Sequence, residues 1–165
     1  MDLADTRTLL DYSAWATDRI LDQAEQLTPD QFAAPPGGAL PSVRQILAHA
    51  LGAEVVWRTR FQTGTPAVDF RPEDFADAGA LRARWETERA AMRAHLATLT
   101  DDDLVGPYRF ARQGTTYELP LWAVFVQLVN HNTQHRAEAA ALLTDAGHSP
   151  GDLDFLFYMM APARG

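Results

Sequence analysis

The longest helical pattern in the chain lies in residues 121–145, which read LWAVFVQLVNHNTQHRAEAAALLTD. Pro120 precedes this stretch and Gly147 follows it, and these residue types are typical of the start and the end of a helix. At steps of three, four or seven residues, which place side chains on one helix face, come Val124, Leu128, His131, His135 and Leu142. The stretch predicts a long amphipathic helix that carries two histidines on its apolar face.

A second apolar stripe runs along the same predicted helix, formed by Trp122, Val126 and Val129. A helix that is apolar on two sides is buried on two sides. In a chain of 165 residues the second partner can be another subunit. We therefore expect a homodimer.

Three further helices are predicted over residues 4–26, 42–62 and 79–99, because apolar residues recur there with helical spacing. Ser42 and Gln45 form a capping-box pattern, and Thr28 with Gln31 forms another before one short extra turn. Residues 33–41 read as a loop, and residues 63–76 form a connection long enough to cross the end of a bundle.

Residues 108–118 differ from the rest, because alternating β-formers flank a turn at Gly114, which predicts a small β-hairpin. The tail at residues 153–160 is rich in aromatic residues and Met, and we expect it to pack on the core. The prediction is an all-α fold, a four-helix bundle of the up-down-down-up type with a small β-hairpin before the last long helix. One domain is expected over residues 1–165.

The composition excludes several kinds of chemistry. The chain has no Cys, which excludes disulfides, thiol nucleophiles and cysteine-bound metal centres. All 14 basic side chains are Arg, so a Schiff-base lysine and a P-loop lysine are also excluded. Catalysis would have to use histidine, carboxylate, hydroxyl or a bound metal.

The formal charge of −8 argues against a nucleic-acid partner, because neutralising phosphates needs a basic face. The N-terminal sequence Met-Asp-Leu-Ala-Asp is acidic where a signal peptide is basic. No apolar run approaches the ~18 residues of a membrane span. These features predict a soluble, cytoplasmic protein with no nucleic-acid and no membrane partner.

The two histidines of the long helix are four residues apart, so their imidazoles can point at one shared position. Taken alone, His131 and His135 could instead be two polar groups on a helix surface, or core histidines bonded to a carbonyl. His49 lies beside Ile46 and Ala53 on the apolar face of a different predicted helix and can supply a third nitrogen. Three imidazoles leave a coordination position open, as in catalytic zinc sites, and zinc, nickel, iron and manganese all suit such ligands.

The chain resembles the DinB-like family of damage-inducible bacterial proteins over nearly its whole length. The resemblance rests on YSAWA at 12–16, LAHALGAE at 47–54, PLW at 120–122 and VNHNTQHR at 129–136. It implies a four-helix bundle with one divalent metal on His49, His131 and His135. The family often has Gly-Gln where this chain has Ala137-Glu138. We expect Glu138 to be solvated, with ligand orientation or a role as a base left open.

The resemblance implies a metal-dependent enzyme of the thiol S-transferase or hydrolase type. Relatives in the wider superfamily use the metal to activate a low-molecular-weight thiol such as bacillithiol or mycothiol. The expected partner is a small-molecule substrate, whose anionic group could meet Arg109 or Arg136. Zinc or nickel is the first expectation for the metal, and no catalytic residue is assigned.

The alternative function is a non-catalytic metal-binding stress-response protein that acts through its dimer surface. A deep cleft over the ion would favour the enzyme, whereas a shallow site would favour this alternative. Other residues are expected to be structural: His95 and Glu88 as an interhelical pair with neighbours, the Asp101–Asp103 run as a solvated end-of-helix loop, and Trp57, Trp85 and Trp122 in the core or an interface.

Overall fold

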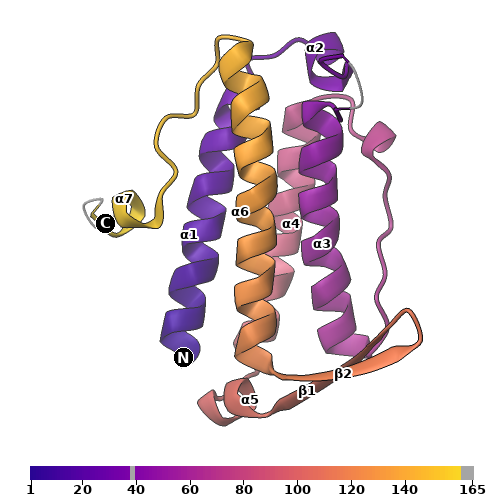
Figure 1. Cartoon of the computed structure of the whole chain (residues 1–165), viewed down its shortest axis with the longest axis vertical. Helices are drawn as coiled ribbons and strands as arrows, with labels where there is room; N and C mark the ends of the chain where they lie inside the picture. The colour runs from indigo at the N-terminus through magenta and orange to yellow at the C-terminus, as the bar shows by residue number, and fades with distance from the viewer. Residues whose placement is uncertain (38–39, 161–165) are drawn as a thin grey trace.

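The computed structural model describes residues 1–37 and 40–160. Four long helices form a bundle (Figure 1): α1 (Leu3–Ala24), α3 (Val43–Thr63), α4 (Ala78–Leu96) and α6 (Leu121–Asp145). Helices α1 and α6 run in one direction and α3 and α4 in the other, which confirms the predicted up-down-down-up bundle. The long connection between α3 and α4 returns the chain along the whole bundle, so these two helices are parallel.

Short elements occupy the connections and the two ends of the bundle. They are α2 (Pro29–Ala33), a 3₁₀ turn η1 (Pro72–Asp74), α5 (Asp101–Val105), β1 (Pro107–Arg112), β2 (Thr115–Pro120) and α7 (Phe155–Met160). The predicted loop at residues 33–41 includes residues 38 and 39, which lie outside the described residues. None of the helices in the described part of the chain combines the length and apolar character that a membrane crossing requires.

Capping side chains set the helix starts where the sequence predicts them. The Ser42 hydroxyl accepts a hydrogen bond from the Gln45 backbone N–H, and Thr28 does the same for Gln31. The Asp101–Asp103 run is not the predicted loop, because it begins helix α5 behind a Thr100 cap. Acidic side chains in a first helical turn interact favourably with the positive end of the helix dipole, which explains the difference.

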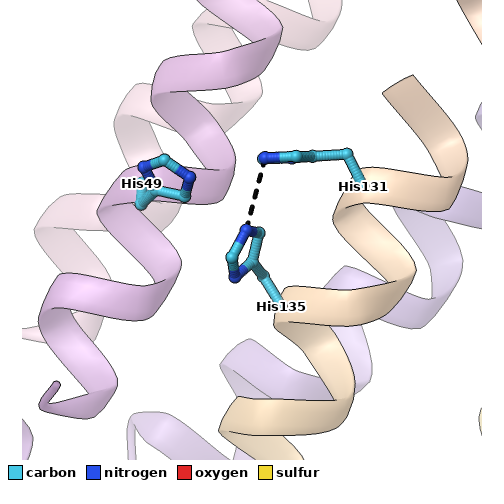
Figure 2. Close-up of side chains that lie close together, drawn as sticks. All are labelled: His49, His131 and His135. Carbon is cyan, nitrogen blue, oxygen red and sulfur yellow. Dashed lines mark hydrogen bonds between the residues drawn. The ribbon is translucent and has the colours of Figure 1, made fainter. Parts of the chain in front are cut away.

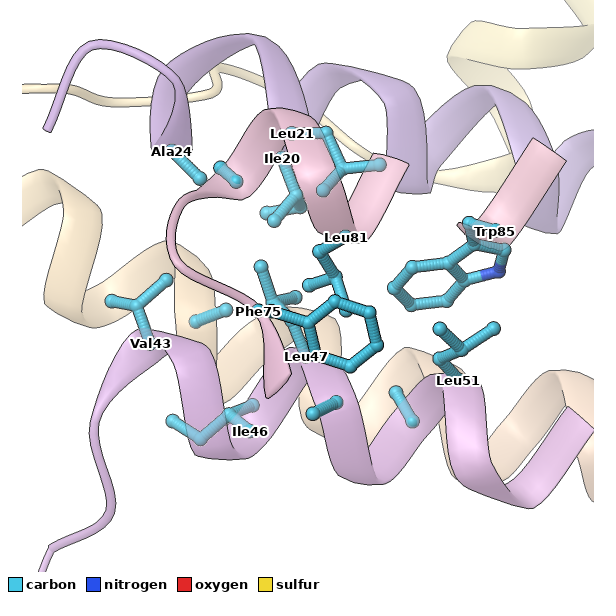
Figure 3. Close-up of a cluster of buried hydrophobic side chains, with 14 of the residues drawn as sticks. Ile20, Leu21, Ala24, Val43, Ile46, Leu47, Leu51, Phe75, Leu81 and Trp85 are labelled. Atoms are coloured by element: carbon cyan, nitrogen blue, oxygen red, sulfur yellow. The ribbon is translucent and has the colours of Figure 1, made fainter. Parts of the chain in front are cut away.

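The main core lies in one half of the bundle, where all four long helices meet (Figure 3). Its fully buried members include Leu21 from α1, Leu47 from α3, Leu81 and Trp85 from α4, and Leu143 from α6. Burying each of these side chains contributes about 1.5–3 kcal/mol to folding. Trp85 is the core residue that the sequence predicted, while Trp57 and Trp122 are partly buried against a second cluster.

The predicted pair of Glu88 and His95 is divided between two different partners. The Glu88 carboxylate is fully buried and accepts hydrogen bonds from Arg58 of α3 at 2.5 and 2.8 Å. The His95 ring stacks on Phe61, with ring centroids 5.6 Å apart. Both residues therefore link α4 to α3, as structural groups outside the histidine cluster.

The predicted hairpin is confirmed as an antiparallel pair with Tyr108 opposite Leu119. Gln113 and Gly114 both have positive φ, which matches the twist of a two-residue hairpin turn. Aromatic side chains of β1 anchor it to the end of the bundle: Phe110 packs edge-on against Trp57. The hairpin thus closes the end of the bundle from which α6 begins.

The tail packs less deeply than predicted. The Tyr12 hydroxyl donates to the Leu153 carbonyl at 3.0 Å, and the Tyr12 ring contacts Phe155. Nevertheless α7 has no buried residue, because it lies beside α1 rather than over the core (Figure 1). On α6, Val129 packs against Tyr12 and Ala16 of α1, so this part of the second stripe is covered within the chain. The homodimer stays a prediction.

Candidate metal centre

Three histidines meet between α3 and α6 (Figure 2). His49 projects from α3, and His131 and His135 project from successive turns of α6. One ring nitrogen of each lies within 4.8 Å of those of the other two. The structure therefore brings together the three residues that the sequence singled out.

The spacing of the two α6 imidazoles suits a common metal ligand position. Their Nε2 atoms lie 3.3 Å apart. Two nitrogens bound to one tetrahedral zinc, each at ~2.0–2.1 Å, are separated by roughly the same distance. His49 faces this pair from α3, with its ring centroid 4.6 Å from that of His135. The donor set fits one divalent transition metal ion.

Glu138 orients His135. The His135 Nδ1 atom lies 2.7 Å from Glu138 Oε2, so Nδ1 carries the proton and donates while Nε2 turns toward His131. That tautomer is the one a metal-binding imidazole needs, and such carboxylate partners recur at metal sites. Glu138 is exposed, as expected, and it also contacts a candidate ligand ring, which favours the role in ligand orientation that the sequence left open.

The cluster is shallower than the sequence predicted. His49 is exposed, whereas His131 and His135 are half-buried. Ile46 and Ala50, which flank His49 on α3, are both buried. His49 thus lies at the edge of the apolar face rather than on it, since a helix turns by about 100° per residue. The three candidate ligands therefore lie at the surface of the bundle, between α3 and α6.

Local electrostatics favour neutral imidazoles. Burial lowers the pKa of His131, and repulsion from a charged His135 lowers it further. The same two causes lower the pKa of His49. For Glu138, burial raises the pKa, but hydrogen bonds from His135 and Gln134 outweigh this effect and leave the pKa lowered. Neutral imidazole is the form that binds metals.

Two polar residues next to the cluster were missed by the sequence analysis. Asn132 follows His131 on α6 and is 1% exposed, and its Nδ2 donates to Glu54 Oε1 of α3 at 2.5 Å. The available signal was their position among apolar neighbours on the core-facing sides of two helices. Among the described residues, neither Asn132 Oδ1 nor His131 Nδ1 has a hydrogen-bond partner.

Neither arginine that was expected to meet an anionic group is free to do so. Arg136 is 2% exposed, and its guanidinium donates to Ser13 Oγ and to Thr133. Arg109 pairs with Glu118 across the hairpin, at the far end of α6. Helical periodicity alone did not show that Arg136 is buried and hydrogen-bonded, rather than exposed beside the histidine cluster.

The bundle and its histidines define a class: helical-bundle proteins with a candidate three-histidine metal site. The sequence model of the DinB family matches residues 2–164, so the chain belongs to the DinB family. This match spans nearly the full range of the predicted single domain. A search of curated proteins finds no match.

Solved structures share the fold. YfiT from Bacillus subtilis, described as a probable metal-dependent hydrolase with an unusual four-helix bundle topology, is 22% identical, with a TM-score of 0.65 over 87% of this chain and 86% of that one. A DinB-like protein from Bacillus cereus is 18% identical, with a TM-score of 0.64 over 87% and 94%. The colibactin self-resistance protein ClbS, solved with double-stranded DNA, is 14% identical, with a TM-score of 0.58 over 86% and 95%. At these identities the likeness establishes the fold alone.

Proposed function

We propose that His49, His131 and His135 hold one divalent transition metal ion and that the protein is a metal-dependent enzyme of the thiol S-transferase or hydrolase type. Zinc or nickel is the first expectation, and iron or manganese also suits three imidazoles. The 3.3 Å separation of the His131 and His135 Nε2 atoms carries the metal assignment.

The proposed chemistry rests on the open coordination position of the metal ion and on the absence of Cys from the chain. A metal ion on three neutral imidazoles keeps a position open, at which it lowers the pKa of a coordinated water or thiol. The chain has no Cys, so any thiol has to arrive as a small-molecule substrate. Glu138 holds His135 in the binding tautomer. The description of YfiT as a probable metal-dependent hydrolase supports the hydrolytic branch.

A second candidate function, a non-catalytic metal-binding stress-response protein, is favoured by one specific observation. His49 is exposed, and none of the three histidines lines the cavity of about 320 Å³ in the described structure. A substrate over the metal would thus be bound mainly by side chains at the surface. In this alternative the protein acts through its dimer surface.

Elemental analysis tests the metal site directly. We expect about one divalent ion per chain in the purified protein and much less in His131→Ala. The matched control is His148→Ala, which removes a histidine outside the cluster. Equal metal content in the protein and in His131→Ala would overturn the assignment.

Activity assays then separate the two functions. The metal-loaded protein is supplied with low-molecular-weight thiols and electrophiles, and separately with esters and amides. Metal-dependent turnover that His49→Ala abolishes would support the enzyme. Full metal loading without thiol consumption or hydrolysis would favour the non-catalytic alternative.

Three further expectations belong to this proposal: a homodimer, a cytoplasmic location and the lack of a nucleic-acid partner. The net charge of −8 supports the last of these. ClbS, which shares the fold, has been solved with DNA. An electrophoretic shift of double-stranded DNA at physiological salt would overturn the expectation.

A further inference from the structure

A cavity of about 320 Å³ opens between α1 and α4, and none of the three clustered histidines lines it. Helices α3 and α6 form its inner end, through Glu54, Leu128 and Asn132. For comparison, a cavity of about 150 Å³ accommodates benzene, so this one has room for roughly twice as many heavy atoms. It is large enough for a small organic molecule.

The middle of the cavity is apolar. Its walls include Leu10 from α1, Met92 and Leu96 from α4, and Leu128 from α6, and the last three are at most 5% exposed. Filling the volume with water alone would place roughly ten water molecules against these side chains, at about 30 Å³ each. An apolar molecule is the better complement to such walls.

The inner end is polar. Glu54 lies inside the bundle yet keeps part of its surface accessible, because it lines the cavity. Asn132 also lines the cavity, and its amide N–H donates to Glu54 Oε1. The carboxyl oxygens of Glu54 are therefore the hydrogen-bond acceptors that this end offers to a ligand.

Two of the three arginines that line the cavity, Arg89 and Arg93, have acidic partners, and the third, Arg7, is exposed on α1. Arg89 donates to Asp18 at 2.6 Å and to the Ala14 carbonyl at 3.2 Å. At the mouth, Arg93 lies 3.9 Å from Asp11. Burial raises the pKa of Glu54 to about 7, so its carboxyl is not a strong anion at neutral pH. A neutral head group suits the inner end better than a strongly charged one.

We propose that this cavity is a second ligand site, which binds a small neutral molecule with an apolar body and a head group whose N–H or O–H donates to Glu54. Primary amides and alcohols belong to this class. The site does not depend on the proposed metal, because no histidine of the cluster lines it.

Two probes of nearly equal shape test the head group: hexanamide, which has N–H donors, and methyl hexanoate, which has none. Their dissociation constants are measured by two-dimensional NMR titration of the full-length protein. We expect hexanamide to bind at least about tenfold more tightly, the factor for one satisfied hydrogen bond. Burial of apolar surface alone would favour the ester, so the order of affinities is diagnostic.

Three variants localise the binding. Ala14→Phe, which fills the cavity from α1, should abolish binding of both probes, whereas Ala83→Phe, at an exposed position on α4, should not. Glu54→Met should reduce the preference for the amide to about unity while the ester still binds. His49→Ala should leave both affinities unchanged, which separates this site from the metal centre.

Circular dichroism checks that each variant folds. If neither probe shifts the resonances of cavity residues at millimolar concentration, the cavity holds only water and the proposal fails. Equal affinities of the two probes would also overturn it, as would an undiminished preference for the amide in folded Glu54→Met.

Discussion

Helices α3 and α6 supply polar side chains to two places that differ in almost every respect. His49, His131 and His135 gather at the surface between α3 and α6, while Glu54 and Asn132 meet at the inner end of a largely apolar cavity. His131 and Asn132 are neighbours in sequence, yet one rotation of about 100° along the helix assigns them to different sites.

The difference shows how burial decides what a polar group requires. At the surface, one ring nitrogen from each of the three histidines lies near the other two, where together they can bind an ion from solvent. In the interior, Glu54 has the Asn132 amide as a partner, and burial raises its pKa to about 7. Polar groups of the first kind are available for function, while those of the second kind also affect the stability of the fold.

The largest expected effect is the stabilisation of the protein by zinc bound to the three histidines. Zinc at about 1,000 times its dissociation constant should raise the free energy of unfolding by about 4 kcal/mol, because it binds only the folded state. Thermal denaturation with zinc and with a chelator measures this effect. His135→Ala should lose the stabilisation and His148→Ala should keep it; an equal gain in both variants would contradict the proposed metal centre.

The next effect concerns the cavity. When folding raises the pKa of a carboxyl, the folded protein loses stability as pH rises from the unfolded pKa to the folded pKa. For Glu54 these two pKa values are 4.5 and about 7. The corresponding difference in unfolding free energy is about 3 kcal/mol. Glu54→Gln should thus be more stable than the parent by up to that amount at pH 8, and similar to it at pH 4.

Urea denaturation at several pH values measures this difference. Glu86→Gln on α4 is the matched control, because it makes the same chemical change at an exposed position. If Glu54→Gln shows the same pH dependence as the parent protein, then Glu54 is solvated through the cavity and does not carry the shifted pKa.

A smaller effect should follow from loss of the carboxylate that orients His135. Glu138→Ala is expected to weaken zinc binding by about 10–100-fold, as loss of such partners does at other metal sites. Competition with a chromophoric chelator gives the affinity. Asp145→Ala removes an exposed acid from the same helix and should have little effect; equal losses in the two variants would point to net charge instead.

The smallest predicted effect is a loss of stability that leaves zinc binding unchanged. Ser13→Ala removes the hydroxyl that accepts from buried Arg136 at 2.8 Å and should lower the free energy of unfolding by about 1–2 kcal/mol. Zinc affinity should not change, because Ser13 lies on α1, whereas the candidate ligands come from α3 and α6. A matching loss of zinc affinity would show that the two regions are energetically coupled.

Much of this architecture was predictable from local patterns. The capping pairs at Thr28 and Ser42 fixed two helix starts, and Pro120 with the apolar repeat fixed the extent of α6. The four-residue spacing of His131 and His135 placed both on one side of α6. These features depend on residues close in sequence, where backbone geometry alone sets the relation between side chains.

The sequence analysis missed other features because they depend on contacts between elements that are distant in sequence. Asp101–Asp103 could end one helix or begin another, and Thr100 decided the second. The depth of His49 depends on how α3 is rotated against α6. The pairing of Arg136 with Ser13 joins residues far apart in sequence. The exposure of α7 follows from where the tail returns along α1.

The sequence by itself determined the helices, the hairpin and the identity of the three candidate ligands, because period and capping act within a few residues. The tertiary structure alone decided that the three ligands lie at the surface, with His49 exposed, and that Glu138 bonds to His135. It also decided that Glu54 and Asn132 lie at the inner end of a separate cavity. The reason is physical: rotation of one packed helix against another sets burial and partners, and no local pattern specifies that rotation.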